Sequence, residues 1–142
     1  MISQTTEYAL RAVVYLASSG GTPINRNAIA EATGVPTDYL TKVLQELDQA
    51  AIVSAQRGPG GGYQLNVDPN NTSVYDVVEA ISGVPRITVC PIVAEGHAKL
   101  CPLHRRLDEA AALVEEAFRN TSISELIPNR RCRSACTFPI ED

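Results

Sequence analysis

The glycine-rich run at 57–62, Arg-Gly-Pro-Gly-Gly-Gly, constrains the fold of this chain more than any other feature of the sequence. It separates two stretches, 52–56 and 63–67, whose length and composition are typical of short β-strands. The sequence therefore predicts a β-hairpin with a glycine-rich tip. Glycines allow positive φ and bring backbone N–H groups close to a phosphate, and Arg57 adds a charged donor beside them.

This hairpin has two other interpretations. One is a hairpin that only reverses the chain, and that interpretation stays open. The other is a nucleotide-binding phosphate loop. The sequence argues against it, because no Gly-Lys-Ser/Thr follows the glycines and both flanks are strand-like.

Three helical patterns precede the hairpin. Apolar spacing predicts a first helix over 5–18, and Asn25 suits the N-cap of a short helix over 27–33 that Gly34 ends. Another helix begins near Pro36, and its apolar residues form one stripe: Leu40, Val43, Leu44 and Leu47. Two short helices that meet at a glycine turn and lead into a hairpin indicate a winged helix-turn-helix.

One more helix completes this unit, because Ser73 suits a helix N-cap and Gly83 a helix end. We therefore expect a mainly α fold with a small β-wing, in which residues 1–83 form a DNA-binding domain.

In a helix-turn-helix the second helix lies in the major groove, where polar side chains reach base edges. The alternative is that these side chains are only solvated surface positions. We expect DNA contacts from the second helix and from the hairpin: Thr37, Tyr39, Thr41, Lys42, Gln45, Arg57, Gly58, Gly60 and Gly61.

The charge balance argues mildly against nucleic-acid binding, since the chain carries a net charge of −4. Residues 1–70 hold four Lys/Arg against six Asp/Glu. A local face matters more than the average, so we expect salt-sensitive binding that dimerisation strengthens.

The second half of the chain follows a different pattern. Residues 84–102 carry prolines and show no sustained period, so we expect an irregular sensor loop there. From Leu103 the apolar residues recur in steps of three and four, which predicts a long dimerisation helix over 103–127. The basic tail, 128–142, is expected to be loosely ordered.

Three segments together resemble one family of bacterial regulators, the Rrf-two family, which includes iron–sulfur and nitric-oxide sensors. They are 39–47, Tyr-Leu-Thr-Lys-Val-Leu-Gln-Glu-Leu, the hairpin with its flanks at 56–63, and 75–81, Tyr-Asp-Val-Val-Glu-Ala-Ile. The resemblance extends to about Leu126. It implies a transcription regulator, most simply a repressor, that binds a roughly palindromic double-stranded operator as a homodimer held by its long C-terminal helix.

Members of that family often carry three loop cysteines that hold an iron–sulfur cluster, with a fourth ligand from elsewhere, and this chain departs from the pattern. Its loop offers two cysteines, Cys90 and Cys101, with His97 between them and His104 just after. Glu7 occupies the place in the first helix where some relatives have an acidic ligand. Because imidazole replaces thiolate in some [2Fe–2S] centres, this set favours [2Fe–2S] over [4Fe–4S].

Other roles for the cysteines stay open. They could be free thiols in a regulator without a cofactor, or a thiol switch that forms a reversible disulfide. Cys132 and Cys136 could also complete the cluster's ligand set if the tail folds back. Zinc is a further alternative, for which the spacing of these two cysteines is closer to the usual pattern. An enzyme built on Cys101 and His104 is not expected, since no orienting carboxylate or oxyanion device has a recognisable spacing.

The N-terminus shows no basic stretch followed by an apolar one, and no apolar run reaches the roughly 18 residues of a membrane span. We therefore expect a cytoplasmic protein without membrane partners, whose four cysteines are thiols or ligands in a reducing compartment.

Overall fold

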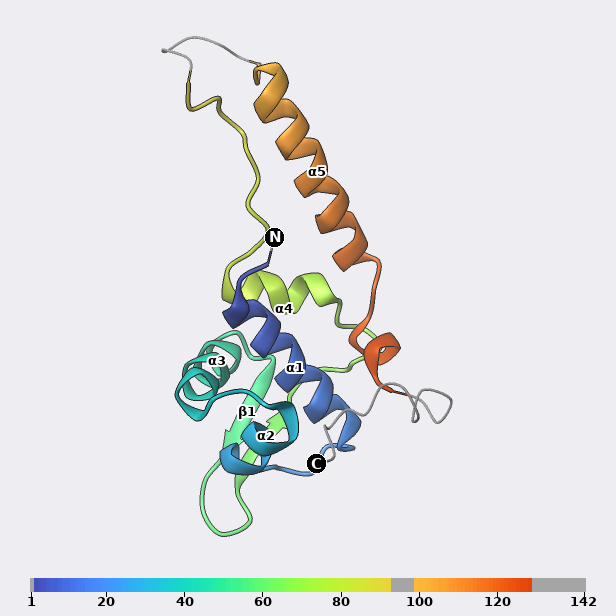
Figure 1. The fold of residues 1–142 in the computed structure, drawn as a ribbon. Helices are drawn as coiled ribbons and strands as arrows, with labels where there is room; N and C mark the ends of the chain where they lie inside the picture. Colours follow the sequence, from blue (N-terminus) through green and yellow to red (C-terminus); the bar gives the residue numbers. More distant parts are fainter. Residues whose placement is uncertain (1, 93–98, 129–142) are drawn as a thin grey trace.

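The hydrophobic core is built around α1 (Gln4–Ser18), which runs through the middle of the head of the molecule (Figure 1). The computed structural model describes residues 2–92 and 99–128. Ala9, Ala12 and Val13 on α1 have no exposed surface. Their small side chains let neighbouring helices approach closely, and the helix expected over 5–18 is confirmed.

The helix-turn-helix follows the local signals of the sequence. Asn25 caps α2 (Arg26–Thr33) by accepting a hydrogen bond from the backbone N–H of Ala28 at 2.8 Å. Gly34 ends α2 with a φ of 68°, a conformation that favours glycine. The next helix, α3 (Thr37–Gln49), buries the expected stripe completely: Leu40, Val43, Leu44 and Leu47.

The wing is a two-stranded antiparallel hairpin in which β1 (Val53–Gln56) pairs with β2 (Gly62–Leu65). Its base is held against the chain before α2, where Ile24 exchanges two backbone hydrogen bonds with Tyr63 at 2.8 and 2.9 Å. A Cβ on Gly62 would lie 2.3 Å from the Ile24 carbonyl oxygen, so this close approach requires glycine. The expected hairpin is confirmed, with strands slightly shorter than predicted.

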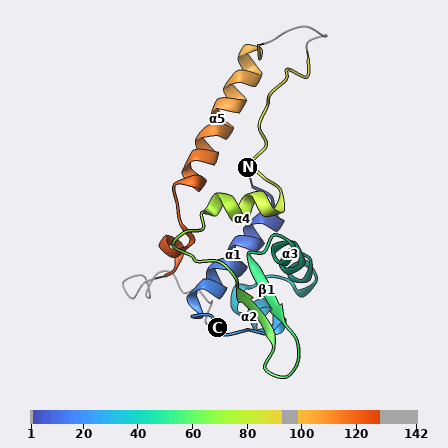
Figure 2. The ribbon, with the colours of Figure 1, turned by 180° about the vertical axis from the view of Figure 1, so that it is seen from behind.

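Beyond the wing, α4 (Val74–Ile81) packs across the head, and Ser73 and Asp76 form a capping box at its start. Segment 84–92 then leaves the head without regular secondary structure. It runs beside α5 (Pro102–Arg119), which together with it forms an arm projecting from the head, as the front and back views agree (Figures 1 and 2).

Our prediction of one helix over 103–127 is wrong at its C-terminal end, because α5 stops at Arg119 and a 3-10 helix, η1 (Ile123–Leu126), follows. The run Asn120-Thr-Ser122 has low helix propensity, and the carbonyl of Thr121 accepts from the backbone N–H of Val74 at 2.9 Å. This bond brings the chain back to the head, where Ile123 is fully buried. The apolar period of three and four alone did not reveal this break.

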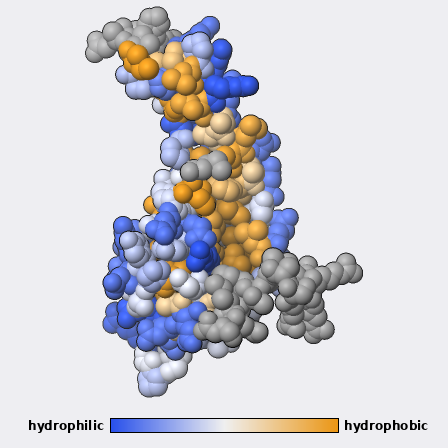
Figure 3. All heavy atoms as spheres, viewed as in Figure 1, coloured by the Kyte–Doolittle hydropathy of each residue, from blue (hydrophilic) through white to orange (hydrophobic). Residues whose placement is uncertain are grey.

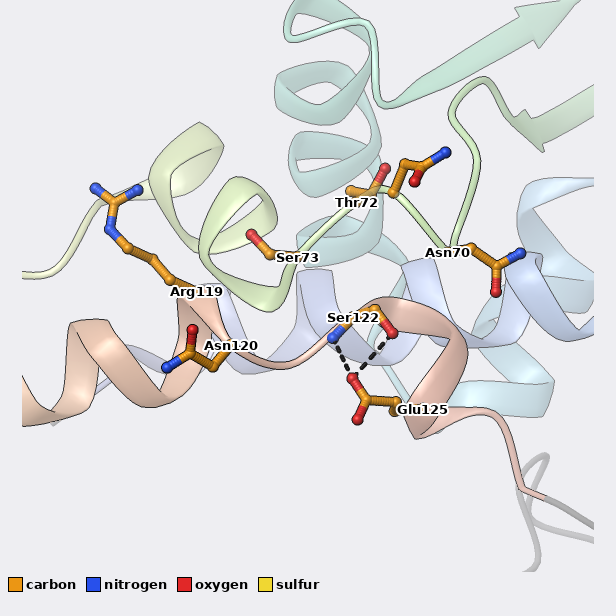
Figure 4. Close-up of a pocket in the computed structure, with 8 residues that line it drawn as sticks. Asn70, Thr72, Ser73, Arg119, Asn120, Ser122 and Glu125 are labelled. Carbon is orange, nitrogen blue, oxygen red and sulfur yellow. Dashed lines mark hydrogen bonds between the residues drawn. The ribbon is translucent and has the colours of Figure 1, made fainter.

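The junction between arm and head is polar. Glu125 accepts hydrogen bonds from the backbone N–H and the hydroxyl of Ser122, shown as dashed lines in Figure 4. Arg119 lies over the ring of Tyr75, 3.6 Å from its centroid, and also lines a hollow of about 200 Å³ at the junction. These contacts fix where the arm leaves the head.

No helix in the described part of the chain is long and apolar enough to cross a membrane. The expected fold class is confirmed: the described residues are mainly helical, with one small antiparallel sheet.

Candidate functional site

The outer face of α3 presents the polar side chains expected to contact DNA. Thr37, Lys42 and Gln45 are exposed, and the Lys42 side chain is 68% exposed. Tyr39 is 50% exposed and packs edge-on against Tyr8, with ring centroids 5.8 Å apart. Tyr39 therefore has a fixed orientation at the surface, and the contact of this face with DNA stays a prediction.

Thr41 is held by its neighbours on the same face. Its hydroxyl donates to the Thr37 carbonyl at 3.0 Å and accepts from Arg26 Nη1, also at 3.0 Å. Sequence reasoning missed Arg26, although a basic residue directly after the Asn25 cap was a usable signal. Arg26 also lines a hollow of about 330 Å³ with Asn25, Asn27 and Tyr63, between α2 and the wing.

The tip of the wing is exposed and shaped by its glycines. Gly58 and Gly60 have φ of 95° and 74°, with open space where a side chain would project. The Gly61 N–H donates to the Gly58 carbonyl at 2.9 Å, and a Cβ on Gly61 would lie 2.4 Å from the Gln56 carbonyl oxygen. The tip is thus a tight turn with Arg57 exposed beside it, as a phosphate contact requires.

The far end of the arm gathers sulfur and nitrogen donors. Cys101 Sγ lies 3.0 Å from His104 Nδ1, and Cys90 Sγ lies 3.5 Å from the same atom. We call Cys90, Cys101 and His104 the cysteine–histidine group; its three donor atoms lie within 4.8 Å of one another. Cys90 is 5% exposed and His104 is 9% exposed, whereas Cys101 is only partly buried, so the group is shielded from solvent on the side of Cys90 and His104.

The group forms because α5 begins inside it. Cys101 is the N-cap residue of α5 and Pro102 is its first residue, so one turn brings His104 back beneath Cys101. Segment 84–92 then delivers Cys90 from the other side.

The environment of Cys90 favours its thiolate. Backbone hydrogen bonds from Ile92 and Cys101 make the largest contributions, and with the Cys101 and His104 side chains they lower the pKa of Cys90 to about 7 despite its burial. The thiolate is the form that binds metals and attacks disulfides.

Not every candidate ligand joins this group. Glu7 pairs with Arg11 at 2.8 Å on α1, and within one chain it is not part of the cysteine–histidine group. A role for Glu7 as a ligand stays a prediction. His97, Cys132 and Cys136 lie outside the described residues.

The donor set fits an iron–sulfur cluster or a thiophilic ion in part. Two thiols and an imidazole are soft or borderline donors of the kind that iron–sulfur clusters and zinc take. Iron–sulfur clusters and structural zinc usually have four protein ligands, and the described residues bring together three within one chain.

The arm carries large apolar side chains in solvent. Leu103, Leu107 and Leu113 on α5 are 58%, 50% and 68% exposed. Figure 3 shows hydrophobic residues gathered along the arm. Large exposed apolar side chains gathered on one arm are typical of an interaction site.

Comparisons with known proteins address the chain as a whole. The model of the Rrf2 (Rrf-two) family, described as iron-dependent transcriptional regulators, matches residues 2–129. An Rrf2-like HTH-type regulator of Rhodobacter capsulatus is 30% identical over 131 residues, covering 89% of this chain and 85% of that protein.

Two solved structures have similar folds. CymR of Bacillus subtilis, the global cysteine regulator, superposes with a TM-score of 0.73 at 25% identity, covering 89% of this chain and 95% of CymR. IscR of T. potens superposes with a TM-score of 0.72 at 22% identity, covering 89% and 85%, which shows a shared fold. The match over nearly the entire described chain means that this protein belongs to the Rrf2 family of DNA-binding transcriptional regulators.

Proposed function

We propose that this regulator binds operator DNA as a homodimer and senses its signal at the cysteine–histidine group. The observation that carries the proposal is the convergence of Cys90, Cys101 and His104 within 4.8 Å. Both thiols lie beside the buried imidazole of His104, and the pKa of Cys90 is lowered to about 7; clustered titratable groups with shifted pKa values are enriched at functional sites.

DNA binding uses the helix-turn-helix and the wing together. The first turn of α3 enters the major groove, and the wing tip places backbone N–H groups and Arg57 at the phosphates alongside. Arg26, fastened to Thr41, adds a cation at the edge of the same face. Because the net charge is −4, binding depends on these few cations and falls steeply with salt.

Dimerisation uses α5. A second copy that packs against the exposed leucines of the arm removes them from water and places two heads side by side. Two heads on one symmetric arm pair match two half-sites of a palindrome. This arrangement also brings the cysteine–histidine group near the interface, where a residue of the second copy such as Glu7 would be available.

Cys90, Cys101 and His104 would hold an iron–sulfur cluster of the [2Fe–2S] type, with the remaining ligand from Glu7 of the partner subunit or from His97. Such a cluster supplies one-electron chemistry and is lost on oxidation or reaction with nitric oxide. The chain itself couples the group to the head, because segment 84–92 joins Cys90 to α4. A change at the group thus alters the segment that sets the arm against the head.

A second candidate is a thiol switch without a metal. The two sulfurs lie within 4.8 Å of each other, and the pKa of Cys90 is lowered to about 7. A disulfide between Cys90 and Cys101 would require the two sulfurs to approach to about 2 Å, through a movement of segment 84–92. In this version, oxidation and not cluster loss changes DNA binding.

The deciding experiment is anaerobic purification of the full chain, followed by visible absorption spectra and assays of iron and acid-labile sulfide. Variants Cys90→Ala, Cys101→Ala and His104→Ala are compared with a matched control, Cys132→Ser/Cys136→Ser. Visible bands lost in the first three and kept in the control would support the cluster. A colourless protein without iron after reconstitution would overturn it and leave the thiol switch, to be tested by mass analysis after oxidation.

A further inference from the structure

Segment 84–92 has no regular secondary structure, yet it is fastened to α5 by a compact set of polar contacts. Arg86 donates to both carboxylate oxygens of Asp108, at 2.8 and 2.9 Å, and to Glu115 at 3.1 Å. The backbone N–H of Ile87 donates to the same Asp108 carboxylate at 2.9 Å. We call Arg86, Asp108 and Glu115 the Arg86 clasp.

The clasp and the cysteine–histidine group lie on one face of α5. His104, Asp108 and Glu115 fall within about 40° of one another around the helix. The segment runs antiparallel to this face, since Arg86 reaches the middle of α5 while Cys90 reaches its first turn. In the described part of the chain, the hydrogen bonds from the segment to α5 come from Arg86, Ile87 and Cys90.

The clasp has the geometry of a specific fastening. A guanidinium forms two parallel hydrogen bonds with a carboxylate only when the two groups have one relative orientation. A point charge such as a lysine ammonium does not impose that orientation. The side chains of Asp108 and Glu115 are 20% and 18% exposed, so the contacts are partly shielded from water. Arg86 and the Ile87 N–H together hold the pKa of Asp108 at about 2.

We propose that Arg86 is a positioning residue for the cysteine–histidine group: its clasp sets the register of segment 84–92 along α5 and so holds Cys90 Sγ beside Cys101 and His104. The residue acts at a distance of about one helical turn, through the backbone, and touches no ligand. The role of this positioning rests on the proposed function of the cysteine–histidine group. The register of segment 84–92 along α5 is measurable without a metal.

The test uses the full chain in a Cys132→Ser/Cys136→Ser background, so that Cys90 and Cys101 are the reacting thiols. Arg86→Ala removes the clasp, Arg86→Lys keeps the charge without the fork, and Asp108→Asn keeps the shape without the charge. Arg106→Ala is the matched control, because Arg106 pairs with Glu109 at 2.9 Å on the same helix and is 86% exposed.

The first readout is titration with Co²⁺, followed by its thiolate-to-cobalt absorption. Substitution of a residue that orients metal ligands without binding the metal typically lowers metal affinity by about tenfold or more. We expect Co²⁺ to bind Arg86→Ala about tenfold more weakly, with Arg86→Lys failing to restore the wild-type affinity and Arg106→Ala unchanged. A purely structural role would lower thermal stability and leave the cobalt spectrum and affinity as they are, which would overturn the proposal.

The second readout needs no metal. Diamide oxidises the two thiols to a disulfide, taking up two electrons and two protons, and the rate reports how often the sulfurs meet. We expect several-fold slower disulfide formation in Arg86→Ala and Asp108→Asn than in the control. If the wild-type protein binds neither cobalt nor iron, the proposed metal function is wrong. The rate of disulfide formation still tests whether Arg86 sets the register of segment 84–92. Equal rates in Arg86→Ala, Asp108→Asn and Arg106→Ala would refute the positioning role.

Discussion

Arg26 Nη1 donates a hydrogen bond of 3.0 Å to Thr41 Oγ1, which joins the start of α2 to the outer face of α3. The bond lies on the exposed side of the helix-turn-helix, so the guanidinium is held at the surface and not in the core. It keeps the remaining donors of Arg26 free for an anion beside the recognition helix. Arg26 is therefore placed to contact a phosphate at the rim of the groove.

We expect Arg26→Ala to weaken binding to an operator duplex by about tenfold, the usual effect of losing one charge-assisted contact. The loss should be similar for operator and unrelated sequences, and the slope of log affinity against log salt should fall by about one per protomer. Fluorescence anisotropy at several salt concentrations measures both. Arg106→Ala, on the arm, serves as the control. An unchanged salt slope in Arg26→Ala would place this residue outside the interface.

The wing base offers a test of stability that is separate from DNA. Gly62→Ala forces a Cβ to within 2.3 Å of a backbone oxygen of Ile24, and backbone cannot yield as a side chain does. Gly60→Ala is the matched change: both glycines have a positive φ, whose strain costs about 1 kcal/mol, but a Cβ on Gly60 meets open space. We expect the free energy of unfolding, measured by urea denaturation, to fall by about 1–3 kcal/mol more in Gly62→Ala than in Gly60→Ala. Equal losses in the two variants would contradict the close approach.

The arm gives a third prediction. Leu107 is 50% exposed and is one of the leucines on α5 that we expect to form the dimer interface. Leu107→Glu would place a carboxylate in that apolar interface. We expect the dimer dissociation constant to rise about a hundredfold or more, seen by sedimentation velocity as a shift to monomer. Glu116→Lys is the control, since Glu116 lies nine positions on and about 180° around the helix. A Leu107→Glu protein that stays dimeric would move the interface elsewhere.

The head was predictable because its helix ends are marked locally. Asn25, Gly34 and Ser73 each end or begin a helix by a contact with residues a few positions away, and each does so in the structure. The wing turn was predictable for the same reason.

The arm was less predictable, because its contacts are distant in the sequence. Arg86 and Asp108 are 22 residues apart, and segment 84–92 carries no periodic pattern that would align it with a helix. Cys101 and His104 are three residues apart, so their proximity on a helix was expected, whereas the place of Cys90 beside them required the fold. The place of Arg26 after the Asn25 cap was a local signal, but its bond to Thr41 on another helix required the fold.

The Arg86 clasp makes the pH dependence of the arm predictable, with Asp108 as its titrating group. Arg86, followed by the Ile87 N–H, lowers the pKa of Asp108 from 3.8 to about 2. A carboxyl whose folded pKa is depressed contributes stability that is present above its unfolded pKa and is lost as pH falls toward the folded value. The stability that the clasp contributes should therefore be fully present above about pH 4 and be lost as the pH falls from about 4 toward about 2, while the carboxylate in the folded protein becomes protonated only around pH 2. Carbon-detected NMR titration of the Asp108 carboxyl measures this directly. We expect a midpoint near 2 in wild type and in Arg106→Ala, and a rise toward 3.8 in Arg86→Ala. If the midpoint is the same in Arg86→Ala as in wild type, the side chains of Arg86 and Asp108 are not paired in solution.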